Sequence, residues 1–312
     1  YSNYSNPFYG SKVGVNGEIN KQSTSALRTN NVQTLTYFQD FDRHSVNVMV
    51  GHEYYKTTTK FLGAIAQGGF SPSIPEIDAF AKISDASSYK SGYNVEGYFG
   101  SAQYNYDQRY FASASFRRDA SSYFAKENRW GNFWSVGGAW LISKENFMQS
   151  SASWLNMLKL KFSVGQQGND NIGAYAYTDL YDLVPTGSTS MGATFKRMGN
   201  PDITWETTTN YNLGVEFSLW EGRLSGNVDY YVKKTSDLLF WLSIPESSGT
   251  RGYYGNVGDI RNMGIEAVLT GAIIRTNNID WTVSANLSHN KTKILSLPES
   301  KTSGMGGFNE TN

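Results

Sequence analysis

Short and long connections alternate along this chain, and that pattern restricts the fold more than any other feature. Stretches of about ten to twelve residues, in which apolar and polar side chains alternate, fit the length of a tilted transmembrane strand. They are joined by tight links near Phe41–Asp42, Asp107–Gln108, Trp220–Arg223 and Ile274–Ile279. Long polar segments lie between them, at roughly 56–94, 119–132, 168–207 and 235–261. The pattern predicts an all-β fold, an antiparallel transmembrane β-barrel segment with short periplasmic turns and long extracellular loops.

The composition excludes several other classes of protein. The 312 residues carry 27 basic and 27 acidic side chains, so the net charge gives no reason to expect nucleic acid as a partner. The absence of cysteine excludes a disulfide scaffold and any thiolate metal site. No run of about 18 apolar residues is present, which excludes a helical membrane span. A barrel needs apolar residues only at alternate positions.

The alternation predicts about ten long strands, with the weakest pattern at 32–41. Apolar side chains at alternate positions are expected to face lipid, because a charge there would cost about 2–4 kcal/mol at the bilayer midplane. The polar positions are then expected to face the lumen. The charged members of this lumen-facing set are Lys159, Lys161, Glu216, Asp229, Lys233 and Glu266.

Aromatic side chains gather near the short-turn ends of the expected strands. They are Tyr104, Tyr106, Tyr110, Phe217, Trp220 and Trp281. Amphipathic rings suit the boundary between lipid and water, so we expect a girdle there. The alternative is ordinary cross-strand packing in a soluble sheet.

The chain is expected to be an interior piece of a longer protein. Residues 1–4 have neither an initiator Met nor the features of a signal peptide, and residues 308–312 resemble the middle of a loop. An unclosed sheet would also leave unpaired backbone groups in hydrocarbon, each costing several kcal/mol.

A series of short motifs along the chain resembles the SusC/RagA family of TonB-dependent outer-membrane transporters. No single motif is specific, but the ordered series is, and it extends over nearly the whole chain. The motifs are Arg117–Phe124, Asn128–Phe133, Glu145–Phe147, Leu158–Gly165, Asn200–Glu206, Asn212–Gly214, Asp237–Leu239, Asn256–Gly258 and Asn262–Glu266. Departures from the usual family residues are small and occur at Ala120, Trp134 and Lys161.

The resemblance implies a bacterial outer-membrane protein with a barrel of twenty-two strands. Residues 1–312 would be part of one barrel domain, with the plug, the N-terminal region and the final strands missing. The whole protein would import oligosaccharides or peptides beneath a SusD-like surface lipoprotein that acts as a lid. The TonB complex would supply energy through the missing N-terminal part. The resemblance implies neither catalysis nor a cofactor.

Candidate ligand contacts are aromatic and basic residues of the long loops. Exposed rings can stack on sugars or pack on a partner. We predict ligand contact for Tyr175, Tyr177, Tyr181, Arg251, Tyr253 and Tyr254. The alternative is that these side chains only fold their own loops together.

No metal or catalytic site is expected. His52–Glu53 matches the start of a zinc-protease motif, but the second His of that motif is missing and the two residues lie in an expected strand. The three histidines offer no Ser–His pairing for a nucleophilic enzyme. Two other functions stay open: a lid-less porin or siderophore-type receptor, and a soluble carbohydrate-binding β-sandwich. A sandwich would stay monodisperse without detergent, whereas a barrel piece would aggregate.

Overall fold

A computed structural model describes residues 1–6, 8, 10–245, 247 and 249–297. The expectation for residues 308–312 lies outside this range. Nearly all regular structure of the described residues is β-strand, and they also form short 3₁₀ helices at Val13–Val15 (η1), Ile77–Ala79 (η2), Ile142–Lys144 (η3) and Asn146–Ser151 (η4). None of the helices formed by the described residues has the length and hydropathy needed to cross a bilayer.

Eleven strands form one sheet in which neighbours along the chain are neighbours in space, apart from two inserted hairpins. The pairings that are resolved are antiparallel. In sheet order the strands are β1 (Ser2–Ser5), β2 (Glu18–Phe41), β3 (His44–Gly69), β4 (Phe80–Tyr106), β5 (Tyr110–Ser121), β6 (Trp130–Leu141), β7 (Leu155–Asn169), β10 (Glu206–Leu219), β11 (Leu224–Ser236), β14 (Asp259–Arg275) and β15 (Asp280–Ser296). The predicted antiparallel all-β fold with about ten long strands is confirmed. The sheet is not closed: within the described residues, the outer edges of β1 and β15 have no partner strand.

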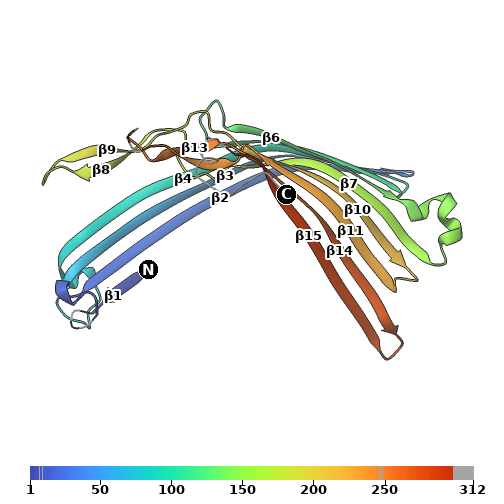
Figure 1. Cartoon of the computed structure of the whole chain (residues 1–312), viewed down its shortest axis with the longest axis horizontal. Coiled ribbons are helices and arrows are strands. Elements are labelled where there is room, and N and C mark those ends of the chain that lie inside the picture. The colour runs from blue at the N-terminus through green and yellow to red at the C-terminus, as the bar shows by residue number, and fades with distance from the viewer. Residues whose placement is uncertain (7, 9, 246, 248, 298–312) are drawn as a thin grey trace. The chain divides into compact units, whose positions relative to one another are not determined.

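Two hairpins interrupt the sequence of the sheet without joining it. β8 (Leu180–Pro185) pairs with β9 (Met191–Arg197), and β12 (Leu239–Ser243) pairs with β13 (Gly252–Asn256). Figure 1 shows the β8–β9 hairpin projecting at the end of β7 and β10 that lies opposite the β10–β11 turn. The long segments expected at 168–207 and 235–261 therefore contain secondary structure of their own.

The chain divides into two compact units. The first comprises Tyr1–Asn31 and Tyr54–Val95, and the second comprises Val32–Glu53 with the described residues from Glu96 onward. In the first unit Ile19 is fully buried, and Glu18 accepts hydrogen bonds from Lys12 and Gln67. The sites discussed below belong to the second unit.

The tight links expected between strands are turns built on left-handed backbone. Asp42, Asp107, Gln108, Trp220, Glu221 and Gly222 all have φ between 51° and 77°. Consecutive left-handed residues match the twist of two paired strands, as in type I′ hairpins. The β14–β15 link closes with a hydrogen bond from Thr276 N to Ile279 O of 2.8 Å.

Three expectations about length were wrong. Most of the segment 56–94 belongs to strands, because β3 continues to Gly69 and β4 begins at Phe80. Several strands are longer than the expected ten to twelve or so residues: β2, β3 and β4 have 24, 26 and 27 residues, and β14 and β15 have 17 each. The β6–β7 connection, on the side of the short turns, holds η3 and η4 and is no tight turn. The sequence did not reveal these parts of β3 and β4 as strands, because residues such as Lys56, Thr57 and Thr58 are polar on both faces. A strand without an apolar face lacks the expected alternation of apolar and polar residues.

Strand register sorts side chains onto two faces of the sheet. Lys159 pairs with Glu216, Gly214 pairs with both Lys161 and Asp229, and Asp229 pairs with Glu266. Lys233 follows Asp229 by an even number of residues, so all six charged residues of the predicted set share one face. We call this the polar face and the opposite one the apolar face. On the apolar face one row across four strands holds Phe162, Leu213, Tyr230 and Ile265, which are 45–56% exposed.

The long loops share a small hydrophobic core. Phe124 and Ile203 are fully buried, and they pack with Phe133, Ile172, Ala176 and Trp205. The ring of Trp205 lies 5.4 Å from that of Phe124 and 5.2 Å from that of Phe133, measured between centroids. Trp205 Nε1 also donates to Arg129 O at 2.9 Å. This loop core joins the β5–β6, β7–β10 and β11–β14 connections into one ordered cap.

Candidate functional site

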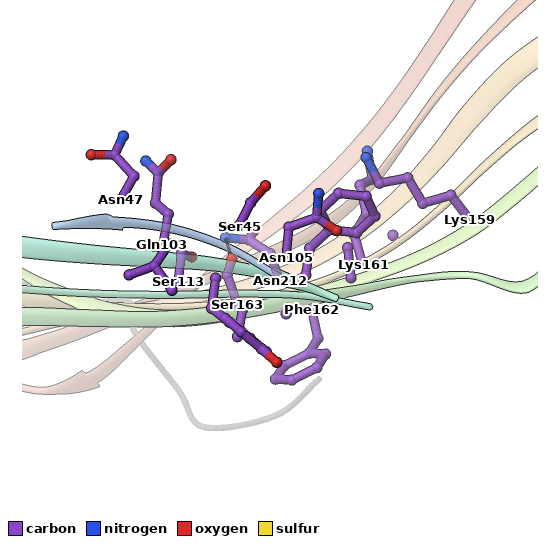
Figure 2. Close-up of a pocket in the computed structure, with 18 of the residues that line it drawn as sticks. Ser45, Asn47, Gln103, Asn105, Ser113, Lys159, Lys161, Phe162, Ser163 and Asn212 are labelled. Atoms are coloured by element: carbon purple, nitrogen blue, oxygen red, sulfur yellow. Dashed lines mark hydrogen bonds between the residues drawn. The ribbon is translucent and has the colours of Figure 1, made fainter. Parts of the chain in front are cut away.

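One cavity lies along the polar face and has a volume of about 590 Å³. Figure 2 shows Asn47, Gln103 and Lys159 on one side of the strands and Phe162 on the other. Its lining includes seven residues with amide or hydroxyl side chains, which are Ser45, Asn47, Gln103, Asn105, Ser113, Ser163 and Asn212. The amide oxygens of Asn47 and Asn105 are buried and accept no hydrogen bond within the described residues. Groups of this kind bind polar molecules or water, not acyl chains.

Charges on the polar face compensate one another across strands. Lys161 Nζ lies 3.7 Å from Glu216 Oε2 and 3.7 Å from Asp229 Oδ1. Lys159 Nζ lies over the Phe111 ring at 5.3 Å. Sequence alternation placed these residues on one face correctly, and the register brings Lys161, Glu216 and Asp229 together. Their position in a water-filled lumen stays a prediction.

A second cavity, of about 370 Å³, lies nearer the loops on the same face. There Arg117 donates to Glu53 Oε2 at 2.8 Å and to Asp119 Oδ2 at 2.7 Å. The Phe133 ring closes one side, packed over Gly168, where any side chain would overlap it. Sequence reasoning missed this cluster. Alternation could have placed Arg117 and Asp119 on one face, but nothing in the sequence pairs them with Glu53.

The six predicted ligand-contact residues separate into two groups. Tyr177 and Tyr254 pack against the loop core, and the Tyr254 ring also contacts Trp241 at 5.0 Å and Arg197 at 5.4 Å. Tyr253 is half-buried on β13. Tyr175, Tyr181 and Arg251 are exposed. The six residues therefore differ in exposure, and ligand contact stays a prediction for all of them.

Aromatic rings form a row at the short-turn end of the apolar face. Tyr110 stacks on Tyr106 at 6.2 Å and on Trp140 at 6.4 Å. His44 continues the row beside Tyr104 and Tyr106. Trp220 and Trp281 are about half exposed. The row has the composition of an interfacial girdle, and most of its members are those the sequence indicated.

Glu145, between η3 and η4, is hydrogen-bonded to two aromatic residues at the end of this row. Its Oε1 accepts hydrogen bonds from the Tyr110 hydroxyl at 2.5 Å and from Trp140 Nε1 at 3.0 Å. The hydrogen bond from Tyr110, then that from Trp140, and the charge of Arg109 lower the pKa of Glu145 below its ordinary 4.5.

We expect this carboxylate to contribute stability that depends on pH. Because its pKa is lowered in the folded state, the contribution is present above pH 4.5 and is lost as pH falls through the lower folded value. The free energy of unfolding of the full-length protein and of a Glu145→Gln variant, measured in urea, should differ at neutral pH and converge in acid. Glu221→Gln, in the exposed β10–β11 turn, is the control. A difference that stays constant with pH would contradict this account of Glu145.

The two-faced sheet, its short turns and its ordered loops agree with a family comparison. The model of the family "TonB dependent receptor-like, beta-barrel" matches residues 1–307. The chain belongs to this family. Its strands are therefore part of an outer-membrane β-barrel.

Similar proteins include two curated receptors. TonB-dependent receptor P26 of Formosa agariphila is 32% identical over 295 residues, covering 91% of this chain and 29% of that protein. TonB-dependent receptor SusC of Bacteroides thetaiotaomicron is 30% identical over 292 residues, covering 91% of this chain and 28% of that protein. The chain thus spans less than a third of the length of these relatives.

Solved structures show the same arrangement of strands. A structure of the RagAB peptide transporter is similar with a TM-score of 0.85 and 30% identity, covering 90% of this chain and 32% of that chain. The outer-membrane transporter YddB of Escherichia coli has a TM-score of 0.56 at 9% identity, which shows the fold alone. The resemblance to the SusC/RagA type seen in the sequence is confirmed.

Proposed function

We propose that this segment forms part of the wall and the extracellular loops of a TonB-dependent transporter, with its polar face toward the transport lumen. One observation carries the proposal: the register places all six charged residues of the predicted set on a single face. The other face presents exposed rings and aliphatic side chains, which lipid would cover. A soluble sandwich would bury that face against a second sheet.

The proposed cargo is an oligosaccharide or a peptide, taken up with a SusD-like lipoprotein as lid and with energy from the TonB complex. The 30% identity to SusC and to a chain of the RagAB peptide transporter supports this type of receptor. Of the candidate ligand contacts, Tyr175, Tyr181 and Arg251 are exposed in the loops. We assign them to first contact with cargo, and Tyr177, Tyr253 and Tyr254 to the support of the same loops.

The test is uptake in cells with and without the full-length gene. Isotope-labelled mixtures of oligosaccharides and of peptides are supplied, and import is followed by mass spectrometry. We expect one class to be imported, with loss of import when TonB is deleted. A surface lipoprotein should co-purify with the full-length protein under mild detergent. Import of both classes without TonB would contradict the proposal and favour a passive porin, and import without any lipoprotein would favour a siderophore-type receptor.

A further inference from the structure

The apolar face ends abruptly toward the loops. Strand register aligns side chains in rows, and the last mainly apolar row holds Val164, Tyr211, Val232 and Met263, with Lys291 at its β15 end. The next row on the same face holds Gln166, Thr209, Lys234, Arg261 and Lys293. Since successive positions on one face are two residues apart, the hydrophobic band gives way to polar and basic groups within a single step.

Four cations gather at this edge: Lys234, Arg261, Lys291 and Lys293. We call them the basic row. Lys234 pairs with Arg261, and Arg261 pairs with Lys293, whereas Lys291 pairs with Met263 and so lies within the last mainly apolar row. Lys291 can reach the edge by extending its stem.

The basic row carries more charge than its surroundings neutralise. Over the described part of the chain, only Lys234 has an ion pair, with Asp259 at 3.4 Å. The Nε of Arg261 is buried and donates to no described group. Like charges directly opposite each other on paired strands destabilise a sheet. An anionic ligand at this edge would relieve that repulsion.

The edge lies at the height where lipid headgroups begin. From Leu224 to Val232 on β11, eight steps of about 3.4 Å make roughly 27 Å along the strand. With a tilt of about 40°, this corresponds to roughly 21 Å across the membrane, near the 25 Å expected of an apolar band. β5 repeats the succession: Phe116 is followed on the same face by Arg118, whose guanidinium lies 5.1 Å from the Trp130 ring centre.

We propose that the basic row binds the phosphate groups of phosphorylated lipids in the leaflet on the side of the long loops. The proposal rests on the proposed function, which places the apolar face in lipid. A guanidinium offers paired donors to phosphate oxygens, and the lysines add point charges. Val232, Met263 and Ile265 lie directly below on the same face and would contact the acyl chains of the same molecule. This combination favours a lipid over free phosphate.

The test uses the full-length protein in neutral detergent micelles doped with diphosphorylated lipid A, with bound lipid counted by native mass spectrometry. Each cation near an anionic lipid surface is worth roughly a fivefold gain in affinity, so Lys234→Gln/Arg261→Gln/Lys293→Gln should weaken binding about 100-fold. The matched control, Lys159→Gln/Lys196→Gln/Lys233→Gln, removes three charges from the polar face and the β8–β9 hairpin and should bind as the parent does. Heat-dependent gel mobility confirms that each variant is folded.

Three results would overturn the proposal: undiminished binding by the first variant, an equal loss in the control, or full displacement by excess inorganic phosphate. The last would mark a site for free phosphate. Uptake is measured on the same proteins. Lipid binding by a wild-type protein that imports nothing would contradict the transport proposal alone. Normal uptake without lipid binding in the wild type would contradict the lipid site alone.

Discussion

Leu213→Arg is expected to lower the free energy of unfolding of the full-length protein in a bilayer by about 2–4 kcal/mol. Leu213 lies in the middle of β10 on the apolar face, between Phe162 and Tyr230, and is 52% exposed. An arginine at the midplane of a barrel's lipid face costs about 2–4 kcal/mol, or about 30- to 900-fold in the folding equilibrium. Urea titration of the protein in phospholipid vesicles, followed by heat-dependent gel mobility, measures the loss.

Asn212→Arg is the matched control, since it introduces the same arginine side chain at the neighbouring position of β10, which lies on the polar face. Asn212 lines the 590 Å³ cavity, and its Nδ2 donates to Ser163 Oγ at 3.4 Å. A charge that points into water should change the free energy of unfolding by about 0.5 kcal/mol or less. Equal losses in the two variants would mean that the two faces do not meet different solvents.

Phe124→Ala is expected to open the loop core while the strands stay folded. Phe124 is fully buried against Trp205, and truncating such a ring costs about 3–5 kcal/mol. Limited proteolysis of the full-length protein in detergent, with fragments mapped by mass spectrometry, should show new cuts within 122–129, 170–205 and 237–258. All three connections should become cleavable together, because one core holds them.

Phe195→Ala, in the β8–β9 hairpin of the same long connection, removes the same ring from a position that is 40% exposed. We expect its cleavage pattern to match that of the unaltered protein. Cleavage confined to 122–129 in Phe124→Ala would show that the three connections fold independently. Loss of the heat-dependent mobility shift would show that the loop core also supports the strands.

The sheet was predictable from sequence where each strand has one apolar and one polar face. β7, β10, β11, β14 and β15 follow this rule, and the charged set was placed on one face before any register was known. The extended lengths of β3 and β4 were not predictable, because polar residues on both faces remove the period-two signal. Their hydrogen bonds to neighbouring strands, and not their side chains, define them.

The loops were harder for a different reason. Ile203 and Trp205 meet Phe124 across about 80 positions of sequence, and local pattern contains no information on such contacts. The same holds for Glu53, which reaches Arg117 from β3. Tyr177 and Tyr254 were assigned to ligand on aromatic character alone, and their rings pack against the loop core. Exposure separates Tyr175, Tyr181 and Arg251 from them, and exposure follows from tertiary structure.

Site-directed spin labelling along β10 tests most directly whether the two faces meet lipid and water. The chain has no cysteine, so single cysteines can be introduced at successive positions from Thr209 to Phe217 in the full-length protein. Accessibility to oxygen, which concentrates in lipid, is compared with accessibility to a water-soluble nickel chelate. We predict that oxygen contact is highest at Tyr211, Leu213 and Val215, and that chelate contact or burial is highest at Asn210, Asn212 and Glu216. Low accessibility to both reagents at Tyr211, Leu213 and Val215 would place these residues inside a protein core and contradict the transmembrane account.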